Sequence, residues 1–281
     1  MPIAFERVSF SYDDERNALE GIDLVVDDGE FLGVIGHTGS GKSTLVQLMN
    51  ALLVPTAGRV LVDGMDTRER KLRRKVRTTV GLAFQYPETQ LFANTVAEDV
   101  AFGPRNLGLS DDEVDRRVRE ALERVGMDYA SVAQRSPFDL SGGQQRRVAL
   151  AGILAMEPRV LVLDEPAAGM DPATVFEIRA YLRELNDQGL TIVLVSHSMD
   201  DVAELCSRII VLDHGVLHMR GTPAELFTAQ NAAELRRINL GVPRATKFAL
   251  ELAERGIEMP DPILNERQLV EVLVALREKA K

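Results

Sequence analysis

The chain has 281 residues, of which 45% are hydrophobic and 27% charged, and its formal net charge is −10. This composition is typical of a folded globular protein, and the acidic balance argues against bulk nucleic-acid binding and against direct attraction to anionic lipid. The one cysteine, Cys206, excludes an internal disulfide and a thiolate metal cage. We expect no signal peptide, and no apolar run approaches the ~20 residues of a spanning helix. Any membrane role must therefore come through a partner.

The N-terminal part of the chain predicts antiparallel strands that lead into a buried strand. Apolar and polar residues alternate over residues 3–12, which is typical of a half-buried strand. Residues 13–17 predict a turn, and residues 18–32 predict two strands broken at residues 27–29. A further strand is predicted over residues 59–63.

A glycine-rich segment, Gly36–Thr44, lies between an apolar strand pattern and a helical pattern. Glycines let the backbone fold tightly, so that several N–H groups point at one anion, and the following helix adds its positive N-terminal end. The alternative is an accidental glycine-rich turn, which the strand-to-helix context disfavours. The segment therefore predicts a phosphate-binding loop, whose expected nucleotide contacts are Gly36, His37, Thr38, Gly39, Ser40, Gly41, Lys42, Ser43 and Thr44.

Between this loop and the next strand lies a basic run over residues 68–77. This run fits two interpretations: a patch that binds nucleic acid or lipid, or a solvated helix surface. The net negative charge of the chain favours the helix surface. A short buried strand over residues 80–84 then ends at Gln85, and the pattern turns helical from Pro87 to Pro158. We expect a helical subdomain over residues 88–158, inserted into an α/β core.

Within this helical region, Ser110 and Glu113 predict a capping box. A second helix is predicted to begin at Ser141. Its lead-in, Ser141-Gly142-Gly143-Gln144, would offer backbone N–H groups, a hydroxyl and a positive dipole end to a phosphate. The alternative is a capped helix with a flexible lead-in.

The second half predicts alternating strands and helices, as expected of a parallel sheet. Its elements are expected at residues 160–163 (strand), 173–187 (helix), 191–195 (strand), 208–219 (hairpin), 223–229 and 243–255 (short helices), and a last helix capped by Asn265. We predict a nucleotide-binding domain over residues 1–222 and an extension over residues 223–281. The extension is too small for a core of its own, so its apolar face should pack on the main domain or on another chain.

Two carboxylates, Asp164 and Glu165, end the apolar strand. Because adjacent strand residues point to opposite sides, the two should do different work. Asp164 suits a Mg²⁺ shell shared with Ser43, and Glu165 can act as general base toward the attacking water. Two solvated turn carboxylates are the alternative.

Together these segments resemble the ABC-type ATPases, over residues 3–222. The matching motifs are Gly36–Ser43 as Walker A, Gln85 as Q-loop, Leu140–Gln144 as signature, Leu161–Glu165 as Walker B, Ala168–Asp171 as D-loop and His197 as switch histidine. The resemblance implies ATP and Mg²⁺ as cofactors, catalytic roles for Glu165, His197 and Gln85, and Ser43, Gln85 and Asp164 as metal-binding residues. It also implies that Tyr12 stacks on adenine, where packing is the alternative. Without the other motifs, His197 would be interpreted as a surface histidine. The remaining histidines, His37, His214 and His218, are interpreted as loop and hairpin residues.

A narrower resemblance is to the ATPases of energy-coupling factor transporters. It rests on residues 87–92, 95–96, 101–108, 136–139 and 151–158. Thr38 favours the second, A-prime subunit, since the first kind tends to carry asparagine there. The resemblance implies a heterodimer with the paralogous A-type ATPase, in which each ATP lies between Lys42 of one chain and Ser141 of the other.

The same resemblance implies a membrane T component, S components that carry a vitamin or metal ion, and a peripheral place on the cytoplasmic side of the cell membrane. Force would pass to the T component through residues 85–108. The alternative is that these residues form an ordinary helical surface. The extension would be a dimerisation region. The rival functions are a dedicated cobalt or nickel importer ATPase and a non-transport ABC protein acting on DNA or the ribosome. A non-transport ABC protein should show coiled-coil insertions, zinc-binding cysteines or two cassettes in one chain, and the sequence has none of these.

Overall fold

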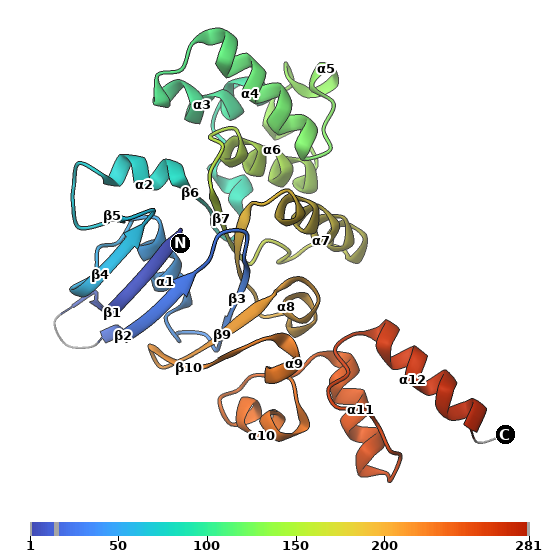
Figure 1. The fold of residues 1–281 in the computed structure, drawn as a ribbon. Helices are drawn as coiled ribbons and strands as arrows, with labels where there is room; N and C mark the ends of the chain where they lie inside the picture. The colour runs from blue at the N-terminus through green and yellow to red at the C-terminus, as the bar shows by residue number, and fades with distance from the viewer. Residues whose placement is uncertain (1, 14–16, 280–281) are drawn as a thin grey trace.

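A computed structural model describes residues 2–13 and 17–279, so most of the turn expected over residues 13–17 lies outside the described residues. Figure 1 shows an α/β body with a group of helices at one end and the C-terminal helices at the other. The predicted α/β class is confirmed. No helix in the described ranges combines the length and apolar character needed to cross a bilayer.

Within the described residues the main sheet has six strands in the order β10-β9-β3-β8-β7-β6. Neighbouring strands from β9 to β6 pair in parallel, and β10 pairs antiparallel with β9. The strands are β3 (Phe31–Gly36), β6 (Val80–Ala83), β7 (Val160–Asp164), β8 (Thr191–Val195), β9 (Arg208–Asp213) and β10 (Val216–Gly221). Because parallel strands end at the same edge, the segments after β3, β6, β7 and β8 meet there.

A second, antiparallel sheet in the described part has the order β2-β1-β4-β5. Its strands are β1 (Ile3–Ser11), β2 (Asn17–Val26), β4 (Ala57–Val62) and β5 (Met65–Asp66). Helix α1 (Lys42–Met49) shares one buried apolar cluster with strands of both sheets, and its Leu45, Leu48 and Met49 are fully buried. The two sheets therefore fix the helix that follows the glycine-rich loop.

The helical region forms as predicted between β6 and β7 (Figure 1). It follows α2 (Arg73–Thr79) and contains η1 (Pro87–Gln90), α3 (Val96–Leu107), α4 (Asp111–Arg124), α5 (Tyr129–Val132), η2 (Pro137–Asp139) and α6 (Gly142–Leu154). Its apolar residues join the cluster that covers one face of the main sheet.

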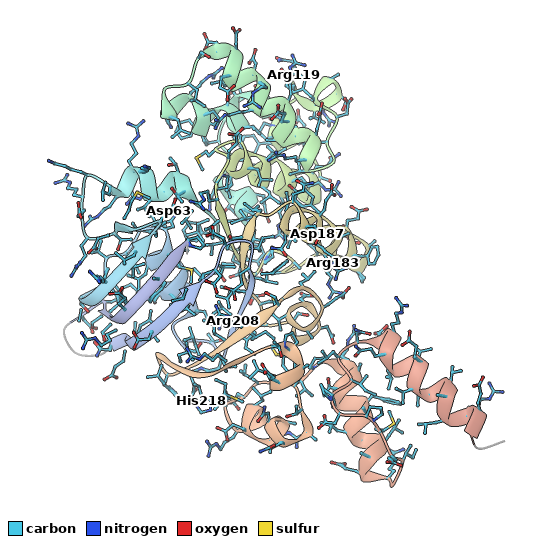
Figure 2. The ribbon with its side chains drawn as sticks, in the orientation of Figure 1. Asp63, Arg119, Arg183, Asp187, Arg208 and His218 are labelled. Carbon is cyan, nitrogen blue, oxygen red and sulfur yellow. The ribbon has the colours of Figure 1, made fainter. Side chains whose placement is uncertain are left out.

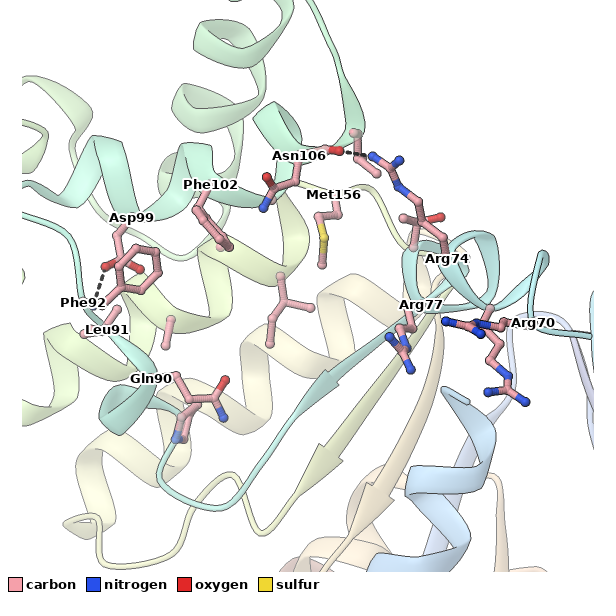
Figure 3. A pocket seen from close by; sticks show the side chains of 18 residues that line it. Arg70, Arg74, Arg77, Gln90, Leu91, Phe92, Asp99, Phe102, Asn106 and Met156 are labelled. Carbon is pink, nitrogen blue, oxygen red and sulfur yellow. Dashed lines mark hydrogen bonds between the residues drawn. The ribbon is translucent and has the colours of Figure 1, made fainter. Parts of the chain in front are cut away.

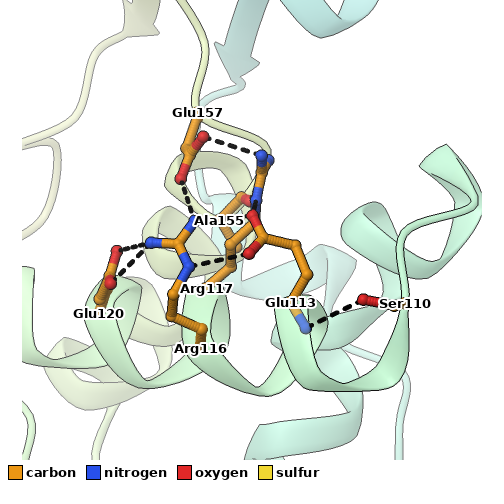
Figure 4. Close-up of polar contacts among 7 residues, drawn as sticks. All are labelled: Ser110, Glu113, Arg116, Arg117, Glu120, Ala155 and Glu157. Atoms are coloured by element: carbon orange, nitrogen blue, oxygen red, sulfur yellow. Dashed lines mark hydrogen bonds and ion pairs between the residues drawn. The ribbon is translucent and has the colours of Figure 1, made fainter.

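The capping box expected at the start of α4 forms only in part. Ser110 Oγ accepts from the Glu113 N–H at 3.4 Å, but the Glu113 carboxylate pairs with Arg116 and Arg117 at 2.7 Å each instead of turning back to the cap (Figure 4). Both arginines also reach Glu157, which follows α6. Charge-assisted bonds to two arginines replace a single bond to the backbone N–H at the cap, and the same arginines also tie α4 to the end of α6.

The C-terminal half continues with α7 (Pro172–Asp187), α8 (Met199–Leu205), α9 (Pro223–Leu226), α10 (Ala229–Arg237), α11 (Arg244–Glu254) and α12 (Glu266–Lys279). Helix α10 was not predicted. Its Leu235 is fully buried in the main cluster, and His218 of β10 lies 2.8 Å from Glu234, which holds α10 against the sheet (Figure 2).

The last two helices project from the body (Figure 1). Ala245, Ala249 and Ile263 form a small buried cluster there, so the expectation that the extension has no core of its own is wrong for this part. The Asn265 cap is confirmed, since its Oδ1 accepts from the Gln268 N–H at 2.9 Å. The domain boundary at residues 222 and 223 stays a prediction.

Candidate nucleotide site

A cavity of about 510 Å³ opens where the parallel strands end. It brings together segments from five places in the chain, and all the predicted catalytic and metal-binding residues line it. The lining residues are Tyr12, Ala18, Thr38, Gly39, Gly41, Lys42, Ser43, Thr44, Gln85, Asp164, Glu165 and His197. Gly36, His37 and Ser40 belong to the same loop but are not among them.

Glycines shape the loop between β3 and α1. Gly41 has a φ of +103°, in the left-handed region, and a Cβ there would lie 2.7 Å from the Ala18 carbonyl oxygen. A Cβ at Gly36 would lie 2.4 Å from the Leu212 carbonyl oxygen. Side chains are excluded at both positions, so the loop takes a path that only glycine allows.

Lys42 lies across the inside of this loop. Its Nζ donates to the carbonyl oxygens of Gly36 at 2.7 Å and His37 at 2.9 Å. Burial lowers the pKa of Lys42, whereas Glu165 and Asp164 act to raise it. A phosphate in the cavity would meet this cation together with the positive N-terminal end of α1.

The oxygen donors expected to hold a metal ion converge here. Ser43 Oγ donates to Asp164 Oδ2 at 3.2 Å, and the Gln85 amide lines the same cavity. Burial raises the pKa of Asp164, and the Ser43 hydrogen bond and Lys42 oppose that rise. Hydroxyl, carboxylate and amide oxygens are the hard donors that Mg²⁺ prefers, so the residues present fit this ion.

Glu165 has the features of a general base. Its φ of +53° is strained for a residue with a side chain, and its N–H donates to the Val195 carbonyl oxygen at 3.0 Å. Its Oε1 is buried and has no hydrogen-bond partner among the described residues, and His197 Nε2 lies 3.5 Å away. Burial, and next the charge of Asp164, raise the pKa of Glu165 to about 7, close to the value that proton transfer at neutral pH requires.

Tyr12 lies at the mouth of the cavity. The residue is 64% exposed, and its hydroxyl oxygen is 3.1 Å from Thr44 Oγ1. Its ring packs edge-on against that of Phe10, with the ring centroids 4.9 Å apart. One ring face is therefore free to receive a planar ligand, and its stacking on adenine stays a prediction.

The second predicted phosphate element, Ser141–Gln144, does not line the cavity. It begins α6 with a complete capping box: Ser141 Oγ accepts from the Gln144 N–H at 3.4 Å, and the Ser141 N–H donates to Gln144 Oε1 at 3.0 Å. Ser141, Gly142 and Gln144 are exposed. Within one chain, the glycine-rich loop therefore lines the cavity, whereas Ser141–Gln144 lies exposed outside it.

Sequence reasoning missed Arg146, which joins three of the predicted motifs. It is 7% exposed and forms two bonds with the Glu88 carboxylate, at 3.0 and 3.1 Å, beyond Gln85. It also donates to the carbonyl oxygens of Pro166 and Ala168 at 3.0 Å each. No sequence signal marks this residue, because its partners reach α6 only through folding.

Known proteins resemble this chain over most of its length. Residues 19–168 match the family model described as ABC transporter. A relative named energy-coupling factor transporter ATP-binding protein EcfA2, from Symbiobacterium thermophilum, is 56% identical over 99% of this chain and 96% of its own length. The EcfA2 protein of Caldanaerobacter subterraneus is 50% identical over 94% of this chain and 93% of its own.

Two solved structures are similar in fold and sequence. The cbiO1 protein of Clostridium perfringens, described as part of the ABC transporter complex cbiONQ, matches with a TM-score of 0.75 and 39% identity, over 85% of this chain and 94% of its own. The ATP-binding cassette MJ0796, in a dimeric post-hydrolysis state bound to ADP and Pi, matches with a TM-score of 0.69 and 30% identity, over 78% of this chain and 98% of its own.

The chain therefore belongs to the ABC transporter family, as one of its ATP-hydrolysing cassettes. Its similarity to the EcfA2 proteins extends over nearly its full length and places it among the ATP-binding subunits of energy-coupling factor transporters. The predicted A-prime kind of subunit is confirmed.

Proposed function

We propose that this subunit hydrolyses Mg²⁺-bound ATP in the 510 Å³ cavity and so powers uptake through an energy-coupling factor transporter. One observation carries the proposal: the glycine-rich loop, Gln85, Asp164, Glu165 and His197 share that cavity, and the Oε1 atom of Glu165 is buried there without a hydrogen-bond partner among the described residues. Ser43, Asp164 and Gln85 would hold Mg²⁺, which supplies Lewis-acid stabilisation of phosphate charge.

Each residue of the cavity has a distinct task. Lys42 exchanges its bonds to the Gly36 and His37 carbonyl oxygens for phosphate oxygens, since a charge-assisted bond to an anion is stronger than one to a neutral carbonyl. Glu165 Oε1 accepts the proton of the attacking water, and His197, 3.5 Å away, orients that water and the phosphate. The loop N–H groups and the start of α1 receive the remaining phosphate charge.

A second chain completes the site. The first turn of α6 leaves the N–H groups of Gly142 and Gly143 without partners inside the helix, and this turn is exposed. Each ATP would therefore bind between Lys42 of one chain and Ser141 of the other. The dimeric state described for MJ0796 supports this arrangement. For this chain we propose the paralogous A-type subunit as the partner, which gives a heterodimer.

A groove of about 830 Å³ offers a docking place for the membrane T component (Figure 3). Its floor comes from α3 and α6, with Phe92 and Phe102 59% and 51% exposed and in edge contact at 4.9 Å. Arginines of the segment around α2 form one rim, among them Arg74, which bonds the Asn106 carbonyl oxygen. An apolar floor with a charged rim suits an amphipathic helix. Docking here would hold the subunit at the cytoplasmic side of the membrane, while S components bind the vitamin or metal ion.

Neighbouring residues of the chain line the groove and the cavity. Pro87 and Gln90 of η1 line the groove, Gln85 lines the cavity, and Glu88 between them is fixed by Arg146. A displacement of η1 by the T component would therefore move Gln85 and, through Arg146, the segment after Glu165. This linkage explains how ATP binding and a change in a membrane partner are coupled.

The proposal is tested by Glu165→Gln in the complete transporter. The variant should bind ATP as the parent does, lose hydrolysis and accumulate as a closed ATPase dimer. Parental turnover would show that Glu165 is not the base. Co-purification should recover a T component and a paralogous ATPase, and a homodimer indifferent to both would contradict the energy-coupling factor assignment of partners.

The likeness to cbiO1 favours a second candidate, a dedicated cobalt or nickel importer. The two candidates share the cavity chemistry and differ in the membrane proteins they bind. Identification of the co-purified S component by mass spectrometry separates them.

A further inference from the structure

Three side chains that do not line the nucleotide cavity lie close together: His37 of the glycine-rich loop, and Asp213 and His214 at the turn between β9 and β10. His37 Nε2 lies 3.0 Å from Asp213 Oδ1, and His214 Nε2 lies 3.8 Å from the same oxygen. The two imidazole rings are 4.7 Å apart, and one potential ligand atom from each residue lies within 4.8 Å of the others. The proposed ATP site uses the main chain of His37, but neither that site nor the docking groove uses these three side chains.

The hydrogen bonds of His37 fix which ring nitrogen can bind a cation. Its Nδ1 lies 2.7 Å from the Thr38 carbonyl oxygen, which can only accept, so Nδ1 carries the proton. In the neutral ring Nε2 then has a lone pair, and this lone pair faces the Asp213 carboxylate, which is also an acceptor. Two acceptors in contact need a proton or a metal ion between them.

The second histidine favours the metal ion. A proton on His37 would bridge only His37 and Asp213, whereas one divalent cation would also use the His214 imidazole, whose Nε2 lies 3.8 Å from the same carboxylate oxygen. A backbone carbonyl that accepts from the other ring nitrogen, as Thr38 does here, is the usual support of a metal-binding histidine.

The main chain already holds the group together. The Gly215 N–H donates to the Ser40 carbonyl oxygen at 3.1 Å, and the Glu20 N–H donates to the Gly215 carbonyl oxygen at 2.8 Å. The side chains of His37 and Asp213 are each 20% exposed and held in place, whereas that of His214 is 83% exposed and has room to turn toward them.

We propose that His37, Asp213 and His214 bind a transition-metal ion of the Zn²⁺, Ni²⁺ or Co²⁺ type. Tetrahedral zinc with bonds of about 2.0–2.2 Å has ligand atoms about 3.3–3.6 Å apart. The separations of 3.0 and 3.8 Å from Asp213 lie close to this range, and a rotation of the exposed His214 side chain would bring its nitrogen, now within 4.8 Å of the other ligand atoms, into it. Two imidazoles and one carboxylate leave a fourth position for water. Mg²⁺ prefers oxygen donors and does not compete for such a site.

The test is calorimetric titration of untagged, nucleotide-free protein with Zn²⁺ in excess Mg²⁺, which occupies the oxygen donors around Asp164. We expect one bound Zn²⁺ per chain at this site and at least tenfold weaker binding after His214→Gln. The matched control is His218→Gln, because His218 belongs to the same hairpin and faces one carboxylate, Glu234, at 2.8 Å. This control should bind Zn²⁺ as the parent does.

Absence of Zn²⁺ binding, or binding that His214→Gln leaves unchanged, would overturn the proposal and leave a hydrogen-bonded contact between His37 and Asp213. If His214→Gln does not fold, Asp213→Asn takes its place with the same expectation. Anomalous diffraction from zinc-soaked crystals gives a second measure, with the peak expected between His37 and His214. The result does not depend on whether the subunit hydrolyses ATP.

Discussion

Replacing Glu165 by glutamine should change how the stability of the nucleotide-free protein depends on pH. Burial, and next the neighbouring charge of Asp164, raise the pKa of Glu165 to about 7 from an ordinary 4.5. A carboxyl with a raised pKa contributes stability in full below its unfolded-state value, and this contribution is lost as the pH rises through the folded-state value. Glutamine carries no charge at any pH, so the variant escapes that loss.

The size of the effect follows from the two pKa values. The interval from 4.5 to about 7, at about 1.36 kcal/mol per pH unit, corresponds to about 3 kcal/mol. The free energy of unfolding of the variant, relative to the parent, should therefore rise by about 3 kcal/mol between pH 4.5 and pH 8. Any loss caused by the amide itself is independent of pH and does not affect this difference.

Urea denaturation at several pH values between 4.5 and 8 measures this difference, with Glu123→Gln on the exposed face of α4 as the matched control. The control should keep the parental pH dependence. If Glu165→Gln also keeps it, burial does not hold the proton on this carboxyl, and the argument that Glu165 is tuned as a base near pH 7 fails. In the parent, kcat/KM for ATP should rise with pH through the same range, since the base acts when deprotonated.

Three further predictions concern the other parts of the subunit. Ser141→Arg, in dimers with one mutant chain, should impair the ATP site that contains the partner's glycine-rich loop; a defect confined to the site of the mutant's own Lys42 would contradict the shared site. Arg146→Ala should lower the free energy of unfolding by about 3 kcal/mol, because it leaves Glu88 and two loop carbonyls unpaired. Urea denaturation measures this loss, and Arg146→Lys should recover only part of the lost free energy. Phe102→Asp should leave ATP binding intact and weaken recovery of the T component in pull-downs, and equal recovery would exclude the groove as its docking place.

Local patterns in the sequence determined much of the fold. The apolar runs that became β3, β7 and β8 could be predicted, since strands buried on both faces need uninterrupted apolar residues. The glycine-rich loop could also be predicted, because its glycines, lysine and serine are contiguous and the flanking strand and helix fix their arrangement. Helix α10 could not, because its apolar residues are few and Leu235 is buried only through the main apolar cluster, which the tertiary structure assembles.

Only the tertiary structure decided the surroundings of these motifs. The order of strands brings Gln85, Asp164 and His197 to the loop at Gly36–Thr44, and the burial that this creates raises the pKa of Glu165. Glu88 lies 58 residues from Arg146 along the chain, and Asp213 lies 176 residues from His37, so these contacts likewise join distant segments. Contacts of this kind depend on how the whole sheet is assembled, so composition and spacing along the chain carry no signal for them.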